Sequence, residues 1–202
     1  MLFRSIDKAE NRAKFSQVMD LLHIKQPEWR ELKTPNEALG FAQDIGYPVL
    51  VRPSYVLSGA AMRVAQNENE LKDFLNLAAV VSKDHPVVIT KFMTDAREIE
   101  CDGVSDKKNV FIGAVVEHIE NAGIHSGDAT MGIPAPTLQF KIWERVQKIT
   151  RKIALALNVV GTFNIQYLIK HEEIYVIEMN LRSSRSMPYV SKTVGVNLIK
   201  LA

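Results

Sequence analysis

The 202-residue sequence predicts a mixed α+β fold made of two subdomains. In the first half, helical patterns alternate with short apolar strands. After about residue 95 the order changes to two strands, one long helix and a hairpin. The segment Met-Thr-Asp-Ala-Arg at 93–97 interrupts the strands between the two patterns. We therefore expect an N-terminal subdomain over residues 1–94 and a C-terminal subdomain over residues 95–202.

Three helices and two strands are expected in the first half. The segment 5–22 has apolar residues at helical spacing, and Ser5 is expected to cap it. In the segment 34–46, Thr34 is the expected cap, Pro35 lies in the first turn and Gly46 ends the helix. A third helix is predicted over 68–83. Short buried strands are predicted over 47–54 and 86–93.

The second half contains the longest predicted helix, over residues 137–159. Its apolar residues recur every three or four positions, which predicts one buried face: Leu138, Ile142, Val146, Ile149, Ile153 and Leu157. Lys and Arg fill the opposite face, which we interpret as solvated. Strands are predicted over 97–106 and 109–120, joined by a polar turn at Asp106 and Lys107. Two more, over 162–170 and 173–182, are close enough in sequence to form a hairpin.

Composition and charge exclude several classes of protein. The net charge of +2 and the lack of a dense Lys/Arg block argue against a nucleic-acid partner. No apolar run reaches the roughly 18–20 residues of a membrane span, and the first residues do not read as a signal peptide. Cys101 is the only cysteine, so it has no intramolecular disulfide partner. We expect Cys101 to be buried in a strand. The single cysteine also fits a protein of a reducing compartment, the cytosol or the mitochondrial matrix. Both ends fall in expected helices, so we expect a piece of a longer protein.

The predicted hairpin, residues 160–182, carries an unusual polar face. On its first strand Phe163, Ile165, Tyr167 and Ile169 are expected to face the long helix, and on its second strand Tyr175, Ile177 and Met179. The opposite face would present Asn164, Gln166, Glu178, Asn180 and Arg182. A three-residue loop at 171–173 would place Gln166 directly across from Glu178.

Carboxylate and amide oxygens grouped in this way suit a hard cation such as Mg²⁺, with arginines facing phosphates or a small anionic substrate. The alternative is a solvent-facing sheet surface with an ordinary ion pair. A Pro, Ser and Gly loop follows Arg52, and residues 52–59 could lie over phosphates through backbone N–H groups. A second Gly-rich loop, 123–130, contains His125 and Ser126.

Several stretches together resemble one known family. They are SIDKAENRAKFS at 5–16, YPVLVRPSYVLSGAAM at 47–62, EHIENAGIHSGDAT at 117–130, FNIQYLI at 163–169 and VIEMNLRSSRSMPYVSKTVGVN at 176–197. This combination is similar to an ATP-grasp domain, and specifically to the second ATP-grasp unit of the carbamoyl phosphate synthetase large subunit. The resemblance covers nearly the whole chain from about residue 5. It implies an α+β ATP-grasp fold in which two subdomains hold a nucleotide between them.

The resemblance also implies a set of ligands and site residues. ATP and Mg²⁺ (or Mn²⁺) would be the cofactors. The implied nucleotide contacts are Arg52, Lys91, Met93, Glu98, Gly123, Ile124, His125 and Ser126, together with Gln166 and Glu178. The implied metal ligands are Gln166, Glu178 and Asn180. Asn180, Arg182 and Arg185 would act on the transferring phosphate or the carbamate.

The stretch Ser-Met-Pro-Tyr-Val-Ser-Lys at 186–192 resembles the half of that synthetase that phosphorylates carbamate. The implied reaction is therefore carbamate plus MgATP giving carbamoyl phosphate, in pyrimidine or arginine synthesis. The implied partners are the rest of the large chain and a glutaminase subunit or domain. Three alternatives stay open: the bicarbonate-phosphorylating half, another ATP-grasp carboxylate–amine ligase, and a nucleotide-binding fragment without activity.

Overall fold

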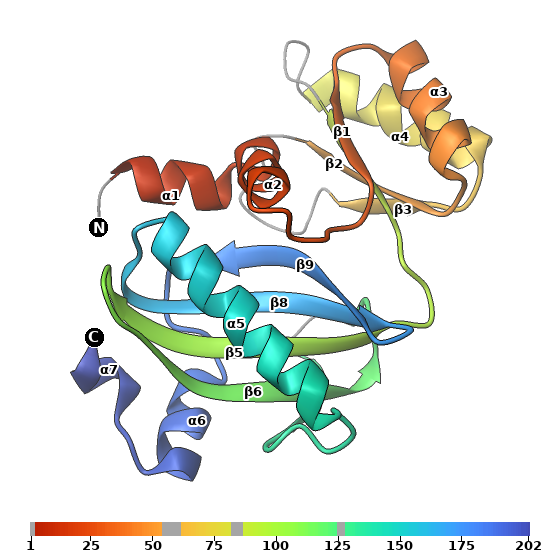
Figure 1. Ribbon diagram of the computed structural model, residues 1–202. Coiled ribbons are helices and arrows are strands. Elements are labelled where there is room, and N and C mark those ends of the chain that lie inside the picture. Colours follow the sequence, from red (N-terminus) through yellow and green to blue (C-terminus); the bar gives the residue numbers. More distant parts are fainter. Residues whose placement is uncertain (1–2, 54–61, 82–86, 125–127) are drawn as a thin grey trace.

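The structure is a computed structural model that describes residues 3–53, 62–81, 87–124 and 128–202 (Figure 1). It contains two antiparallel sheets. The first has the strand order β1-β4-β2-β3, formed by Trp29–Leu32, Val87–Lys91, Val49–Pro53 and Arg63–Ala65. Helices α3 (Pro35–Ile45) and α4 (Glu68–Val81) contribute buried apolar residues to the core on this sheet. The phosphate loop expected at 52–59 lies mostly outside the described residues.

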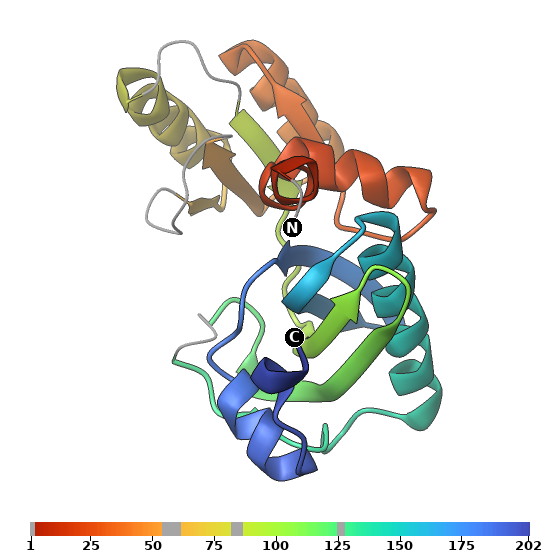
Figure 2. The ribbon, with the colours of Figure 1, turned by 90° about the vertical axis from the view of Figure 1, so that its left-hand side faces the viewer.

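The second sheet is larger and has the strand order β7-β6-β5-β8-β9. Its strands are Met131–Gly132, Val110–Asn121, Arg97–Asp106, Val160–Lys170 and Glu173–Asn180. Helix α5 (Phe140–Ala156) lies across one face (Figure 1). Helices α6 (Met187–Val194) and α7 (Leu198–Leu201) lie on the other side of the sheet (Figure 2). Met187, Val190 and Leu198 of these helices pack with Val104 and Val116, while β5 and β8 also carry buried polar side chains, Asp102 and Asn164 among them.

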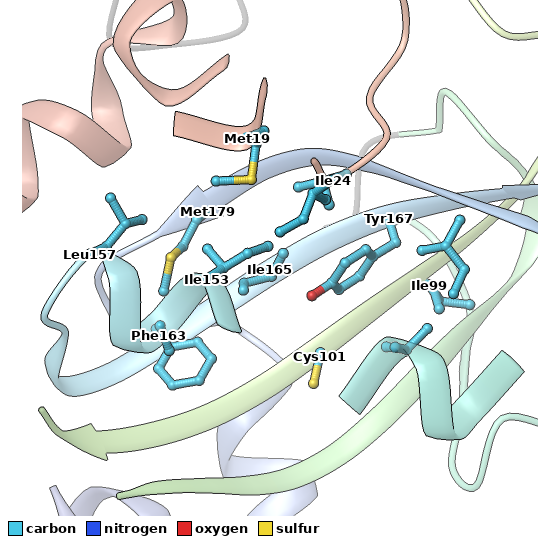
Figure 3. Close-up of a cluster of buried hydrophobic side chains, with 14 of the residues drawn as sticks. Met19, Ile24, Ile99, Cys101, Ile153, Leu157, Phe163, Ile165, Tyr167 and Met179 are labelled. Atoms are coloured by element: carbon cyan, nitrogen blue, oxygen red, sulfur yellow. The ribbon is translucent and has the colours of Figure 1, made fainter. Parts of the chain in front are cut away.

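The main core lies between α5 and the second sheet (Figure 3). Ile153 and Leu157 meet Phe163 and Ile165 of β8 there, which confirms the predicted apolar faces of the helix and the first hairpin strand. Cys101 is fully buried in the same core, and burial raises the pKa of its thiol to about 12. This confirms that Cys101 is a strand residue unsuited to nucleophilic chemistry.

The N-terminal segment differs from the prediction, because it forms two helices where one was expected. Helix α1 (Phe3–Glu10) ends before Asn11, whose side chain accepts a hydrogen bond of 3.0 Å from Lys14 N and caps α2 (Arg12–Leu21). Ser5 lies inside α1, so its assignment as a cap is wrong. Phe15 and Met19 of α2 are buried in the core of the second sheet. The division at residues 94 and 95 stays a prediction, but these two helices pack with the C-terminal sheet.

Helix α3 begins as predicted, with a capping box. Thr34 Oγ1 accepts from Glu37 N at 3.3 Å, and Glu37 accepts from Thr34 N at 3.1 Å. We expect Thr34→Ala to lower the free energy of unfolding by about 1 kcal/mol, because one backbone N–H loses its partner. Urea denaturation measures this. Thr94→Ala, an exposed threonine in the connection between the sheets, should change stability by less than about 0.5 kcal/mol. Equal losses in both variants would contradict the capping argument.

The hairpin of β8 and β9 pairs as predicted at its open end, although its turn is shorter. Gln166 lies opposite Glu178, and Asn164 lies opposite Asn180. The turn contains only His171 and Glu172, whose φ angles of 50° and 63° are typical of a two-residue type I′ turn. A register shift between Gln166 and Tyr167 restores the predicted pairing.

That register shift leaves Ile177 as the extra residue of the second strand. As a result Ile174, Val176 and Met179 are the residues of β9 that face the core. The expected set of Tyr175, Ile177 and Met179 is therefore wrong except for Met179, because a strict alternation cannot continue through a bulge.

Candidate functional site

The polar face of the second sheet carries a buried hydrogen-bond network centred on Glu100. Its carboxylate is 2% exposed and accepts from Asn164 Nδ2 at 2.9 Å and from Gln166 Nε2 at 3.0 Å. His118 Nε2 lies 3.2 Å from the same carboxylate. Burial acts to raise the pKa of Glu100, but the hydrogen bonds from these three residues outweigh it and lower the pKa. Glu100 therefore stays ionised and fixes the side chains around it.

His118 completes this network from β6. Burial acts to lower its pKa, but the hydrogen bond to Glu100 and the charge of Glu98 outweigh burial and raise it. Glu98, Glu100 and His118 offer ligand atoms that all lie within 4.8 Å of one another, an arrangement that also suits a cation. Burial raises the pKa of Glu98 itself.

The raised pKa of His118 predicts a pH-dependent stability. The stabilisation is complete below the ordinary histidine pKa of about 6.5 and is lost as pH rises through the raised, folded-state pKa. We expect His118→Asn to lose more unfolding free energy relative to the wild type near about pH 6 than near about pH 8. Urea denaturation in metal-free buffer at both values tests this. A deficit that grows with pH would contradict the assigned partners.

The predicted metal ligands lie together beside this network. Asn180 Nδ2 donates to Glu178 Oε1 at 3.2 Å, and Gln166 lies across the hairpin from Glu178. Because the amide nitrogens of Gln166 and Asn180 are engaged by carboxylates, each amide can offer its carbonyl oxygen as a ligand. Arg52 from the first sheet lies 3.7 Å from Glu178 Oε2. Two amide oxygens and a carboxylate fit Mg²⁺, which prefers oxygen ligands.

Four of the predicted nucleotide contacts lie at or near the connection between the two sheets: Lys91, Met93, Glu98 and Gly123. Lys91 Nζ donates to the carbonyls of Gly46 and Tyr47 at 2.8 Å and 3.0 Å, at the start of the connection between the sheets. Met93 is half-buried in that connection. Glu98 accepts a long hydrogen bond of 3.4 Å from Gly123 N, which brings these two predicted nucleotide contacts together.

Five predicted site residues remain. Ile124 is 45% exposed beside Gly123. Arg182 and Arg185 are exposed on the segment that follows β9, and neither forms an ion pair among the described residues. His125 and Ser126 lie outside the described residues, so their assignment as nucleotide contacts stays a prediction.

Four residues in or beside the site were not predicted as site residues: Glu100, His118, Asp102 and Arg12. Glu100 and Asp102 share a strand face with the predicted Glu98, so alternation along this strand could have identified both. Arg12 gave no signal in the sequence, since it looks like a surface residue of a helix. It is 6% exposed and donates to the carbonyl of Ile177, at the bulge next to Glu178.

Comparison with known sequences shows the family of this chain. Residues 11–202 match the family model described as carbamoyl-phosphate synthase L chain, ATP binding domain. The chain is 54% identical to the multifunctional protein pyr1-3 of Dictyostelium discoideum over 98% of its own length and 9% of that protein. It is 52% identical to the mitochondrial carbamoyl-phosphate synthase [ammonia] of rat, covering 98% of this chain and 13% of the rat protein. The chain is 51% identical to the carbamoyl phosphate synthase large chain of Sulfurisphaera tokodaii, over 98% of its own length and 19% of that protein.

Solved structures support the fold. Biotin carboxylase from Campylobacter jejuni matches with a TM-score of 0.87 at 22% identity, covering 98% of this chain and 46% of that one. The biotin carboxylase domain of the Hydrogenobacter thermophilus 2-oxoglutarate carboxylase, solved with MgADP and bicarbonate, matches with a TM-score of 0.82 at 23% identity, covering 96% and 44%. Within the described ranges, the helices are too short or too polar to cross a membrane.

The predicted α+β ATP-grasp fold is therefore confirmed, and the chain spans 9% to 19% of the length of these curated relatives. With 192 matched positions, residues 11–202, this chain belongs to the family of carbamoyl-phosphate synthase large-chain ATP-binding domains.

Proposed function

We propose that this domain phosphorylates carbamate with MgATP, as part of a carbamoyl phosphate synthetase large chain. The observation that carries the proposal is the pairing of Gln166 with Glu178 and of Asn164 with Asn180 on the hairpin. This pairing brings the oxygen ligands together, and Glu178 Oε2 among them lies 3.7 Å from the guanidinium of Arg52. The stretch at 186–192 resembles the carbamate-phosphorylating half of that synthetase, which favours carbamate over bicarbonate as the acceptor.

In this proposal the residues of the chain position reactants and balance charge. Mg²⁺ held by Gln166, Glu178 and Asn180 would neutralise charge on the nucleotide phosphates. Arg52 and the connection around Lys91 and Met93 would hold the nucleotide, and Glu98 would hold its ribose. Arg182 and Arg185, with their exposed guanidinium groups, would bind the transferring phosphoryl group and the carbamate.

The test is the reverse partial reaction, in which carbamoyl phosphate and MgADP give carbamate and MgATP. We expect this chain to form ATP, measured by a coupled luminescence assay. ATP hydrolysis that depends on bicarbonate, without ATP formation, would assign the chain to the bicarbonate-phosphorylating half. Binding of MgADP by calorimetry with neither reaction would favour the other two alternatives, another ATP-grasp carboxylate–amine ligase or a nucleotide-binding fragment without activity. The missing parts of the large chain and a glutaminase remain its proposed partners.

A further inference from the structure

Asp102 is a buried carboxylate that the proposed chemistry does not use. Its side chain is 0% exposed on the polar face of β5. It accepts from Ser184 Oγ at 2.6 Å, from Ser186 Oγ at 2.5 Å and from Asn164 Nδ2 at 3.0 Å. Within the described part of the chain, no lysine or arginine pairs with it. A buried carboxylate without a cation needs several hydrogen-bond donors, and three neutral side chains provide them here.

Both serines belong to one short segment, residues 181–186, which joins β9 to α6 and which we name the arginine loop. Arg182 and Arg185 extend from it into solvent. Each serine that binds Asp102 is therefore within two positions of an arginine in the sequence. Ser184 Oγ also accepts from Met187 N at 3.1 Å, which ties the loop to the start of α6.

Local preference does not explain this arrangement. Ser186 is the N-cap residue of α6, yet its hydroxyl makes no capping hydrogen bond to the helix. The hydroxyl is directed instead at Asp102, 84 positions earlier in the sequence. A serine that forgoes the usual cap loses about 1 kcal/mol of helix stabilisation, so the long-range contact overrides the local one.

Asn164 connects this contact to the proposed metal ligands. Its Nδ2 donates both to Asp102 at 3.0 Å and to Glu100 at 2.9 Å. Glu100 in turn accepts from Gln166 at 3.0 Å. One buried network on two adjacent strands therefore holds the arginine loop at one end and a proposed metal ligand at the other.

We propose that Asp102 is a positioning residue that latches the arginine loop to the sheet and so places Arg182 and Arg185 relative to Gln166 and Glu178. The role given to the two arginines rests on the proposed function. The latch itself rests only on the hydrogen bonds and burial described above. Asp102 does not touch the reacting groups, and it acts through Ser184 and Ser186.

The latch is tested from the loop side, because replacing the buried Asp102 could unfold the protein. The variant Ser184→Ala/Ser186→Ala removes both hydroxyls. The matched control is Ser183→Ala, an exposed serine of the same loop that contacts Thr162 Oγ1 at 3.1 Å and makes no contact with Asp102. Trypsin cleaves after arginine, so the rate of native-state cleavage after Arg182 and Arg185, followed by mass spectrometry, reports how firmly the loop is held.

We expect cleavage at these two sites to become at least about tenfold faster in the double variant and to stay within about twofold in the control. In the reverse reaction, kcat should fall about tenfold or more while KM for MgADP stays within about twofold. The single variant Ser184→Thr keeps a hydroxyl at this position. Its cleavage rate and its kcat should both stay close to those of the wild type.

Unchanged cleavage in the double variant would overturn the latch, whatever the activity. Faster cleavage with unchanged kcat would overturn the positioning role. If the wild type forms no ATP, the proposed function fails, and the cleavage comparison alone then decides whether Asp102 holds the loop.

Discussion

Glu178→Gln should lower the metal-dependent rate of ATP formation on the order of 100-fold or more. Glu178 is the only carboxylate among the three proposed metal ligands. Gln has nearly the same shape, so the substitution removes the ligand charge while the strand pairing with Gln166 is kept. The side chain is only partly buried, and its pairing with Arg52 spans 3.7 Å, so the fold should survive the change. Initial rates across a Mg²⁺ titration measure the effect.

The matched control is Glu173→Gln, the same substitution on the same strand. Glu173 lies at the turn end of β9, whereas the proposed ligands lie toward the open end of the hairpin. Its Oε2 lies 3.0 Å from Lys25 Nζ. Its replacement should leave the rate within about twofold, since it removes only the exposed ion pairs with Lys25 and Arg145. A Glu178→Gln enzyme that keeps the wild-type rate and Mg²⁺ dependence would exclude Glu178 as a metal ligand. Equal losses in both variants would instead indicate damage to the hairpin.

The hairpin shows what a sequence pattern can and cannot predict. Alternation of polar and apolar residues identified the polar face, and the assumed three-residue loop gave the pairing of Gln166 with Glu178. It did not identify the bulge at Ile177, because a bulge changes which face a residue occupies without changing the composition. The predicted loop was one residue too long, and the bulge compensates for that residue. The pairing of Gln166 with Glu178 was therefore predicted correctly although the turn was not.

The elements that the sequence did not predict are short or lie at edges. Strands β1 and β3 have four and three residues, and β1 is mostly exposed, so they contain no apolar run to signal them. The break between α1 and α2 depends on one side-chain cap at Asn11, which the helical spacing on either side conceals. Long elements such as α5 and β8 were predicted well, because each has an apolar face that runs along most of its length.

Long-range polar contacts are the second class that a single sequence hides. The partners of Asp102 lie more than 60 positions away, and the carbonyl bound by Arg12 lies 165 positions away. Nothing local distinguishes Arg12 from the exposed Lys14 two residues later. Such contacts depend on how α2 packs on the second sheet, and that packing follows from the burial of Phe15 and Met19.

Arg12 is the residue for which we expect the largest loss of stability. Burial and the neighbouring Arg52 lower its pKa to about 9, while Glu178 opposes this shift, so it stays cationic at neutral pH. Its guanidinium donates to the carbonyl of Ile177 and lies 5.9 Å from the ring centre of Phe15. The contact satisfies a carbonyl at the bulge, the point where β9 changes register before Glu178.

Arg12→Met should lower the free energy of unfolding by about 2–3 kcal/mol. Methionine fills similar space and avoids the cost of burying a cation, but it leaves the Ile177 carbonyl without that donor, and the second effect should be larger. Urea denaturation measures the loss. Gln17→Met, an exposed position of the same helix, should change stability by less than about 0.5 kcal/mol.

A double-mutant cycle of Arg12→Met and Glu178→Gln then separates two roles of Arg12. If Arg12 acts only on the bulge carbonyl, the two losses of stability should add. If its charge also stabilises Glu178, as their proximity indicates, the coupling energy should lie in the range of about 0.5–3 kcal/mol. We expect coupling, because Arg12 and Arg52 are both close enough to influence this carboxylate. Additive losses would restrict Arg12 to the architecture of the bulge and leave Arg52 as the cation that serves the site.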